Sequence, residues 1–183
     1  MRAVAAACRA TGHHAFVDVL EGDVVGVTPR VPALADCPGT VGVGPAADLT
    51  GIEPSFATAS RVLEVAERFG QPGVYRLEDL SLRVAVAAED ELGELLVRRY
   101  LRPLEKLGAR AGAVFETVAA FIEHGLSVKA TAEALDVHQN TVRYRLGRFE
   151  ELTGASLERP LTAFEVWWAM QRDWLTQHGG DNL

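Results

Sequence analysis

The chain has 183 residues, which is enough for one large domain or two small ones. Its hydrophobic fraction of 48% is that of a globular protein with a core, and no apolar run approaches the roughly 18 residues of a membrane span, which argues against a membrane protein. The formal net charge of −7 is spread over both halves, so binding to nucleic acid would have to depend on a local basic patch.

The sequence offers no set of residues with the spacing of a metal site. Cys8 and Cys37 form no motif and are interpreted as reduced thiols of a cytoplasmic protein. His13 and His14 have no acidic or cysteine partner nearby, so surface histidines are favoured over metal ligands. We therefore predict no metal and no other cofactor.

The first part of the chain alternates β-branched runs with amphipathic stretches, which is the pattern of a small α/β domain. The predicted elements are a helix at 2–10, strands at 15–20 and 24–28 joined as a hairpin, a strand at 40–44, a helix at 53–69, a strand at 74–77, and helices at 80–88 and 91–107. The first helix is short and charged residues soon follow it, so it is not interpreted as a signal peptide. We expect an antiparallel or mixed sheet with helices on it, and Pro103 should disturb the last helix.

The second part is predicted to be helical throughout. Residues 107–112 contain two glycines and small side chains, which predicts a flexible linker. A helix over 113–124 should support the elements that follow. The last helix, 162–176, carries Trp167 and Trp168, which point about 100° apart. Both are hard to bury in one monomer, which favours a subunit or domain interface.

A helix-turn-helix is predicted between these two helices. Ser127 is a good N-cap for a short helix to Leu135, and the next three residues leave room for a tight turn alone. A second helix should run from about residue 138 or 139 to 152, with Gly154 as its stop. On this helix, apolar residues recur on one side, which can meet the first helix: they are Val142, Leu146 and Phe149.

The opposite side of the second helix has the chemistry of a DNA reader. Residues 138–149 include three arginines and no acid. Asn140, Arg143 and Tyr144 are predicted to contact base edges or the groove, and Gln139 can also read a base. Thr141, Arg145 and Arg148 should mainly set position on phosphates. The predicted DNA-binding set is His138, Gln139, Asn140, Thr141, Arg143, Tyr144, Arg145 and Arg148. The alternative is an amphipathic helix with a solvated basic face.

A family resemblance rests on this stretch. The pattern T-A-x-x-L-x-V-H-x-N-T-V-R-Y-R-L at 131–146, followed by E-E-L-T-G at 150–154, resembles the C-terminal helix-turn-helix of PucR/CdaR-type bacterial transcriptional regulators. The same core is similar to the Fis-type DNA-binding domain. The family pattern usually has a basic residue where Gln139 stands. It often has another where Gly147 stands. The resemblance implies binding to a double-stranded DNA operator, a homodimer and a small-molecule effector.

A looser resemblance covers the first part of the chain. Scattered positions, among them 42–44, 48–52 and 73–80, resemble the GGDEF-like domain that precedes the helix-turn-helix in these regulators. Active GGDEF domains need acidic metal ligands beside a glycine-rich hairpin, and no Gly-Gly-Asp-Glu-Phe motif occurs in this chain. The chain is therefore expected not to be an enzyme.

The resulting prediction is an α+β protein, with a small degenerate GGDEF-like α/β domain at 1–108 and an all-α helix-turn-helix bundle at 109–183. We expect a cytoplasmic, sequence-specific transcriptional regulator whose recognition helix, about 138–152, lies in the major groove. The chain is either a fragment of a longer regulator or a short member without a sensory region. The alternative function is a non-DNA-binding module whose α/β domain senses a metabolite or a partner.

Overall fold

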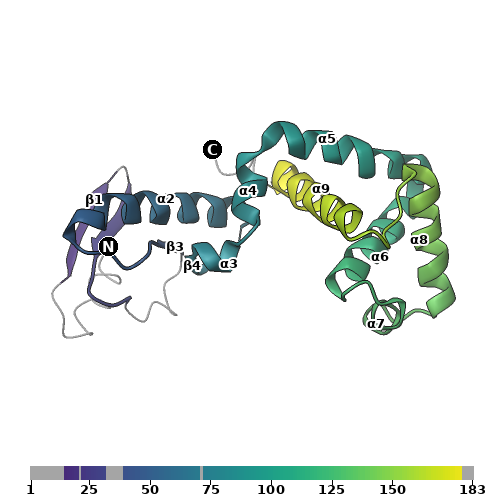
Figure 1. Ribbon diagram of the computed structural model, residues 1–183, viewed down its shortest axis with the longest axis horizontal. Helices are drawn as coiled ribbons and strands as arrows, with labels where there is room; N and C mark the ends of the chain where they lie inside the picture. Colours follow the sequence, from purple (N-terminus) through teal and green to yellow (C-terminus); the bar gives the residue numbers. More distant parts are fainter. Residues whose placement is uncertain (1–14, 21, 32–38, 71, 179–183) are drawn as a thin grey trace. The chain divides into compact units, whose positions relative to one another are not determined.

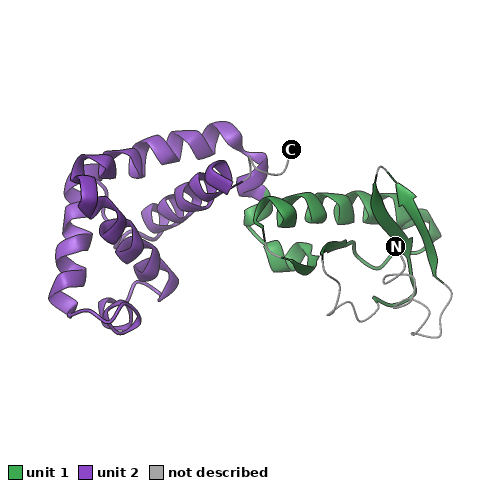
Figure 2. Ribbon diagram, turned by 180° about the vertical axis from the view of Figure 1, so that it is seen from behind, with its two compact units in different colours: residues 1–84, 182 green, residues 85–181, 183 purple. Residues whose placement is uncertain are grey.

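The computed structural model describes residues 15–20, 22–31, 39–70 and 72–178. The predicted helix at 2–10, both cysteines and the pair His13 and His14 lie outside these ranges. The chain divides into two compact units, with the division between Val84 and Ala85 in the sequence (Figure 2). Each unit is described by itself below.

The first unit contains two separate sheets of two strands in its described part (Figure 1). β1 (Phe16–Leu20) pairs antiparallel with β2 (Asp23–Val27), which confirms the predicted hairpin. β3 (Thr40–Val43) pairs parallel with β4 (Gly73–Arg76). The expectation of one antiparallel or mixed sheet was therefore wrong, because the hairpin strands pair with each other and the parallel pair is closed by a separate helical crossover.

The crossover between β3 and β4 is α2 (Ile52–Arg68), preceded by the 3₁₀ helix η1 (Leu49–Gly51). α2 lies so close to β3 that a Cβ atom on Gly42 would stand 2.1 Å from the carbonyl oxygen of Ala59. Gly42 therefore allows strand and helix to touch. On α2, the side chains of Val62, Val65 and Ala66 are buried and form the core of this unit.

α3 (Leu77–Leu80) belongs to the first unit, and α4 (Arg83–Ala88) spans the boundary between the units. The second unit then continues with α5 (Asp90–Tyr100) and the 3₁₀ helix η2 (Arg102–Arg110). The predicted helix at 91–107 is thus divided, with Pro103 in the first turn of η2, where its missing N–H is tolerated. The predicted flexible linker at 107–112 lies at a kink, since Gly108 has non-helical backbone angles, with a φ of 53°, and the next helix begins at Ala111. Its flexibility stays a prediction.

The second unit is a bundle of helices. After η2 come α6 (Ala111–Glu123), α7 (Val128–Ala134), α8 (Gln139–Thr153) and α9 (Pro160–His178). α5 and α9 pack side by side and run antiparallel, since Gly93 meets Arg172 and Tyr100 bonds to Glu165 (Figure 1). Of the described helices, none is both long and apolar enough to cross a membrane.

The tryptophans of α9 are placed differently from each other. Trp168 is buried, whereas Trp167 is half-buried and stacks on Phe164 with ring centroids 6.0 Å apart. Their predicted part in an interface stays a prediction. The proposed domain boundary between residues 108 and 109 also stays a prediction, although in space α5 and η2 belong with the helical unit.

Candidate nucleic-acid interface

The first helix of the helix-turn-helix, α7, is fixed at both ends by local hydrogen bonds. The side chain of Ser127 accepts from the backbone N–H of Ala130 at 3.3 Å, as predicted for an N-cap. Asp136 follows the helix with a φ of 51°, and the N–H of Val137 then donates to the carbonyl of Ala132 at 3.0 Å. The positive φ of Asp136 turns the chain at a single residue, so α8 can begin shortly afterwards.

His138 is the N-cap of α8. Its Nδ1 accepts from the backbone N–H of Asn140 at 3.1 Å, and its carbonyl accepts from the N–H of Thr141 at 2.8 Å. Because Nδ1 is an acceptor, a neutral imidazole carries its proton on Nε2. The exposed side chain therefore presents an N–H donor at the start of the helix. At the other end, Gly154 has a φ of 67° and stops α8 where the sequence predicted.

The inner side of α8 is the predicted one. Val142 and Phe149 are fully buried and Leu146 is nearly so, against α6 and α7 (Figure 1). On α7, Ala132 is buried, and its small side chain suits two helices that contact each other. These contacts decide which side of α8 remains available to a ligand.

The outer side of α8 gathers polar and cationic side chains. Asn140 and Arg143 are exposed, and Tyr144 is 60% exposed. The Arg143 guanidinium donates to the amide oxygens of Asn140, at 3.3 Å, and Gln139, at 3.4 Å. Both acceptors are neutral amide oxygens. The structure thus brings Gln139, Asn140 and Arg143 together as one polar group beside Tyr144.

Thr141, Arg145 and Arg148 of α8 are half-buried. Arg148 pairs with Glu151, one turn further along the same helix. Arg145 is half-buried and donates from Nη1 to the hydroxyl of Thr117 on α6, at 3.1 Å. Sequence reasoning missed Thr117, and the available signal was a lone hydroxyl within the apolar stripe of α6.

Gly147 lies inside α8, near the outer side. A Cβ atom added there would meet no other atom within 4 Å, so nothing within this chain requires glycine at this position.

The nearby acid Glu150 is directed elsewhere, since its carboxylate accepts from the backbone N–H of Leu157 at 2.9 Å. The loop after α8 is therefore held by Glu150.

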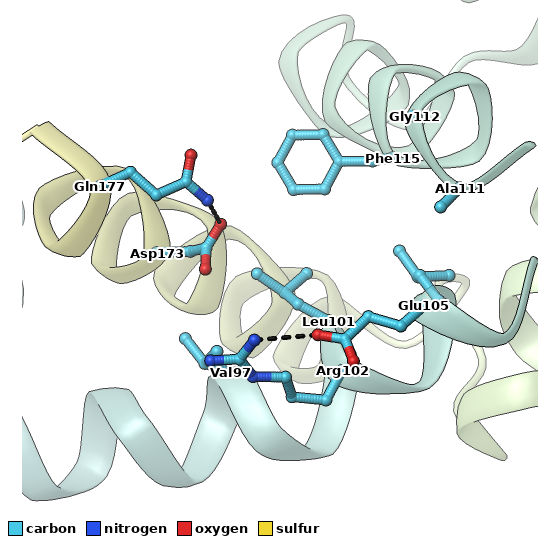
Figure 3. Close-up of a pocket in the computed structure, with 10 residues that line it drawn as sticks. Val97, Leu101, Arg102, Glu105, Ala111, Gly112, Phe115, Asp173 and Gln177 are labelled. Carbon is cyan, nitrogen blue, oxygen red and sulfur yellow. Dashed lines mark hydrogen bonds and ion pairs between the residues drawn. The ribbon is translucent and has the colours of Figure 1, made fainter. Parts of the chain in front are cut away.

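A cavity of about 220 Å³ lies in the same unit, where η2, α6 and α9 meet (Figure 3). Arg102 pairs with Glu105 at 2.9 Å on one side, and Gln177 donates to Asp173 at 2.7 Å on the other. Burial raises the pKa of Asp173. The residues that line the cavity are Val97, Leu101, Arg102, Leu104, Glu105, Ala111, Gly112, Phe115, Asp173 and Gln177.

Comparison with known proteins gives a family match over part of the helical unit. Residues 114–171 match the PucR C-terminal helix-turn-helix domain. The chain is 36% identical over 110 residues to the carbohydrate diacid regulator of Escherichia coli (strain K12), covering 58% of this chain and 28% of that protein. It is 39% identical over 54 residues to the purine catabolism regulatory protein of Bacillus subtilis (strain 168), covering 30% of this chain and 10% of that protein.

Among solved structures, the chain is similar to a regulator of polyketide synthase expression from Bifidobacterium adolescentis. The TM-score is 0.41 at 24% identity, with 94% of this chain and 79% of that chain covered. The chain spans less than a third of the length of the first two curated relatives it matches, which are covered to 28% and 31%.

Proposed function

We propose that this chain, which belongs to the PucR/CdaR-type regulators through its C-terminal helix-turn-helix domain, binds a double-stranded DNA operator and regulates transcription. The observation that carries the proposal is the outer side of α8, an exposed and acid-free group of amide, guanidinium and phenol side chains directly after a tight turn. In this role α8 lies in the major groove. Bacterial DNA lies in the cytoplasm, which is therefore the proposed location.

The side chains of α8 divide by role in this proposal. Asn140, Arg143 and Tyr144 contact base edges or the groove, and Gln139 reads a base beside them. Amide side chains can bond adenine with two hydrogen bonds, and arginine can do the same for guanine. His138, through its Nε2–H, Thr141 and Arg148 bond phosphates. These last contacts fix the position of the protein on the duplex but carry no sequence information.

A homodimer would bind DNA more strongly, since each copy of the chain offers few cations to the phosphates. The net charge of −7 means that the long-range field of the chain does not attract DNA, so local contacts must supply the affinity. Two copies of α8 related by a two-fold axis would read half-sites about 34 Å apart, one helical turn of DNA. The operator should then be palindromic.

Arg143 provides the sharpest test of the DNA-reading surface. We expect the purified chain to bind DNA from upstream of its own gene in the presence of random duplex, and more weakly at higher salt. Arg143→Ala should weaken operator binding by about 1–3 kcal/mol and relax specificity at one base position. Arg61→Ala, at an exposed position of α2, is the matched control and should change nothing. Unchanged operator binding by Arg143→Ala would contradict the proposal.

The second candidate is a regulatory module that binds a metabolite or a partner instead of DNA. The cavity between η2, α6 and α9 favours it, because carboxylate, guanidinium and amide groups line it together with apolar side chains. The cavity lies in the helical unit, not in the α/β part that the sequence suggested for sensing. The salt dependence of DNA binding separates the candidates, since a slope near zero would favour the module without a DNA function.

A further inference from the structure

We propose that Arg145 is a positioning residue, which holds α8 in register on α6 through the hydroxyl of Thr117, and is not a phosphate ligand. The inference rests on the proposed function, because it concerns how α8 is presented to DNA. It revises the sequence-based expectation for Arg145, which placed this side chain on the DNA backbone.

Two hydrogen bonds connect the Arg145 side chain to the backbone of α6. Arg145 Nη1 donates to Thr117 Oγ1 at 3.1 Å, and that hydroxyl donates in turn to the carbonyl of Ala113 at 2.7 Å. Thr117 is fully buried, so bulk water does not compete for hydrogen bonds to its hydroxyl oxygen. Its proton is committed to Ala113, which leaves a lone pair for the guanidinium. A bond from a charged donor is stronger than one between neutral groups.

The other two arginines of α8 make different contacts. Arg143 bonds to amide oxygens of its own helix, and Arg148 pairs with Glu151, also on α8. Within the described part of the chain, Arg145 is the arginine of α8 that bonds to another helix. Its side chain is half-buried, whereas Arg143 is exposed. Three identical side chains on one helix thus have three different environments.

The hydrogen bond from Arg145 adds a directional contact to the apolar contacts of α8. Val142, Leu146 and Phe149 hold α8 against its neighbours by hydrophobic burial, which is non-directional. A base-reading side chain must reach its partner within about 0.5 Å to make a good hydrogen bond. The directional hydrogen bond between Arg145 and Thr117 therefore helps to keep the base-reading side chains of α8 in place.

Thr117→Val tests the anchor without changing any charge. Valine has the shape of threonine without the hydroxyl, and the site is buried, so this position cannot touch DNA. The probe is an operator duplex selected by the wild-type chain from a random-sequence pool. We expect about tenfold weaker binding for Thr117→Val, since a hydrogen bond to a charged group is lost. The slope of log affinity against log salt should stay unchanged. Thr117→Ser should restore binding.

Arg148→Met is the matched control for a phosphate contact on the same helix. It should lower the salt slope by about one counterion, whereas Arg145→Met should lower it less than that. In the double variant with Thr117→Val, Arg145→Met should cause little further loss. If Thr117→Val binds like the wild type and Arg145→Met lowers the slope as much as Arg148→Met, Arg145 is a phosphate ligand and the anchor is refuted.

Unfolding measurements keep this proposal separate from the DNA function. A double-mutant cycle of Thr117→Val and Arg145→Met, followed by urea unfolding, measures their coupling without DNA. We expect a clearly non-additive cycle. Additive losses would overturn the anchor even if the chain binds its operator. Failure of the wild type to bind any duplex, together with a coupled cycle, would instead refute the proposed function alone.

Discussion

Gly147 occupies a position inside α8 where the surrounding side chains and backbone of this chain do not require glycine. Inside a helix, glycine is about 1 kcal/mol less favourable than alanine. Because a Cβ atom at this position meets nothing within 4 Å, Gly147→Ala should stabilise the helical unit by about that amount. Urea unfolding followed by tryptophan fluorescence is a suitable measurement, since all three tryptophans lie in α9. A loss of stability would show that α8 is strained there.

Tyr100 gives the helical unit a dependence on alkaline pH. Its buried hydroxyl donates to Glu165, and burial, followed by this bond, raises the pKa of Tyr100 to about 12. The folded chain keeps the phenol proton between pH 10 and 12, where the unfolded chain loses it. The contribution of Tyr100 to stability is therefore complete below pH 10 and is lost as the pH rises through 12.

Tyr100→Phe should remove this dependence. From pH 9 to pH 12 the wild type should lose about 2 kcal/mol more unfolding free energy than the phenylalanine variant. Urea unfolding at both pH values gives the difference directly. At pH 8 the variant should be less stable by about 1 kcal/mol, because Glu165 loses a hydrogen bond. Equal pH profiles for the two proteins would mean that the phenol titrates normally in the folded chain.

At the scale of elements, the packing of α5 on α9 depends on a second glycine. A Cβ atom on Gly93 would lie 2.7 Å from Cγ of Arg172, whose guanidinium pairs with Asp90 and Glu94. Gly93→Ala should therefore destabilise the unit by about 1 kcal/mol, since overpacking outweighs the gain in helix propensity. The same substitution thus has opposite signs at positions 93 and 147. A stabilised Gly93→Ala variant would show that Arg172 moves freely and that the contact between α5 and α9 is loose.

The elements that sequence reasoning predicted well are those determined by neighbouring residues. The apolar spacing of Val142, Leu146 and Phe149 identified the inner side of α8, and the caps Ser127 and Gly154 marked helix ends. Such information is local, because caps and periodicity act within a turn or two of helix. The pairing of β3 with β4 was not accessible in this way, since it depends on contacts over more than thirty residues of chain.

The candidate site shows the same division. The exposed positions of Asn140, Arg143 and Tyr144 followed from the helical period. The bond between Arg145 and Thr117 joins residues of two helices and could not be read from either helix alone. Local sequence therefore gives the composition of the surface, whereas tertiary contacts decide which of its arginines is available to DNA.

At the scale of the molecule, the packing of α5 predicts where the chain can be cut. A fragment 85–183 keeps α5 and η2 against α9, including the bond between Tyr100 and Glu165. A fragment 109–183 matches the sequence-based domain boundary but exposes the side of α9 that α5 covers. Losing buried partners such as Leu96 and Val97 should cost the shorter fragment several kcal/mol, at about 25 cal/mol per Å² of apolar surface.

Thermal unfolding of both fragments, monitored by helical circular dichroism, decides between the boundaries. We expect fragment 85–183 to unfold cooperatively at nearly the same temperature as the helical unit of the whole chain. Fragment 109–183 should unfold at a much lower temperature, because small cores have little stability to lose. Equal melting temperatures would mean that α5 and η2 add nothing to the helix-turn-helix bundle, and the boundary at residue 108 would then describe the folding unit as well.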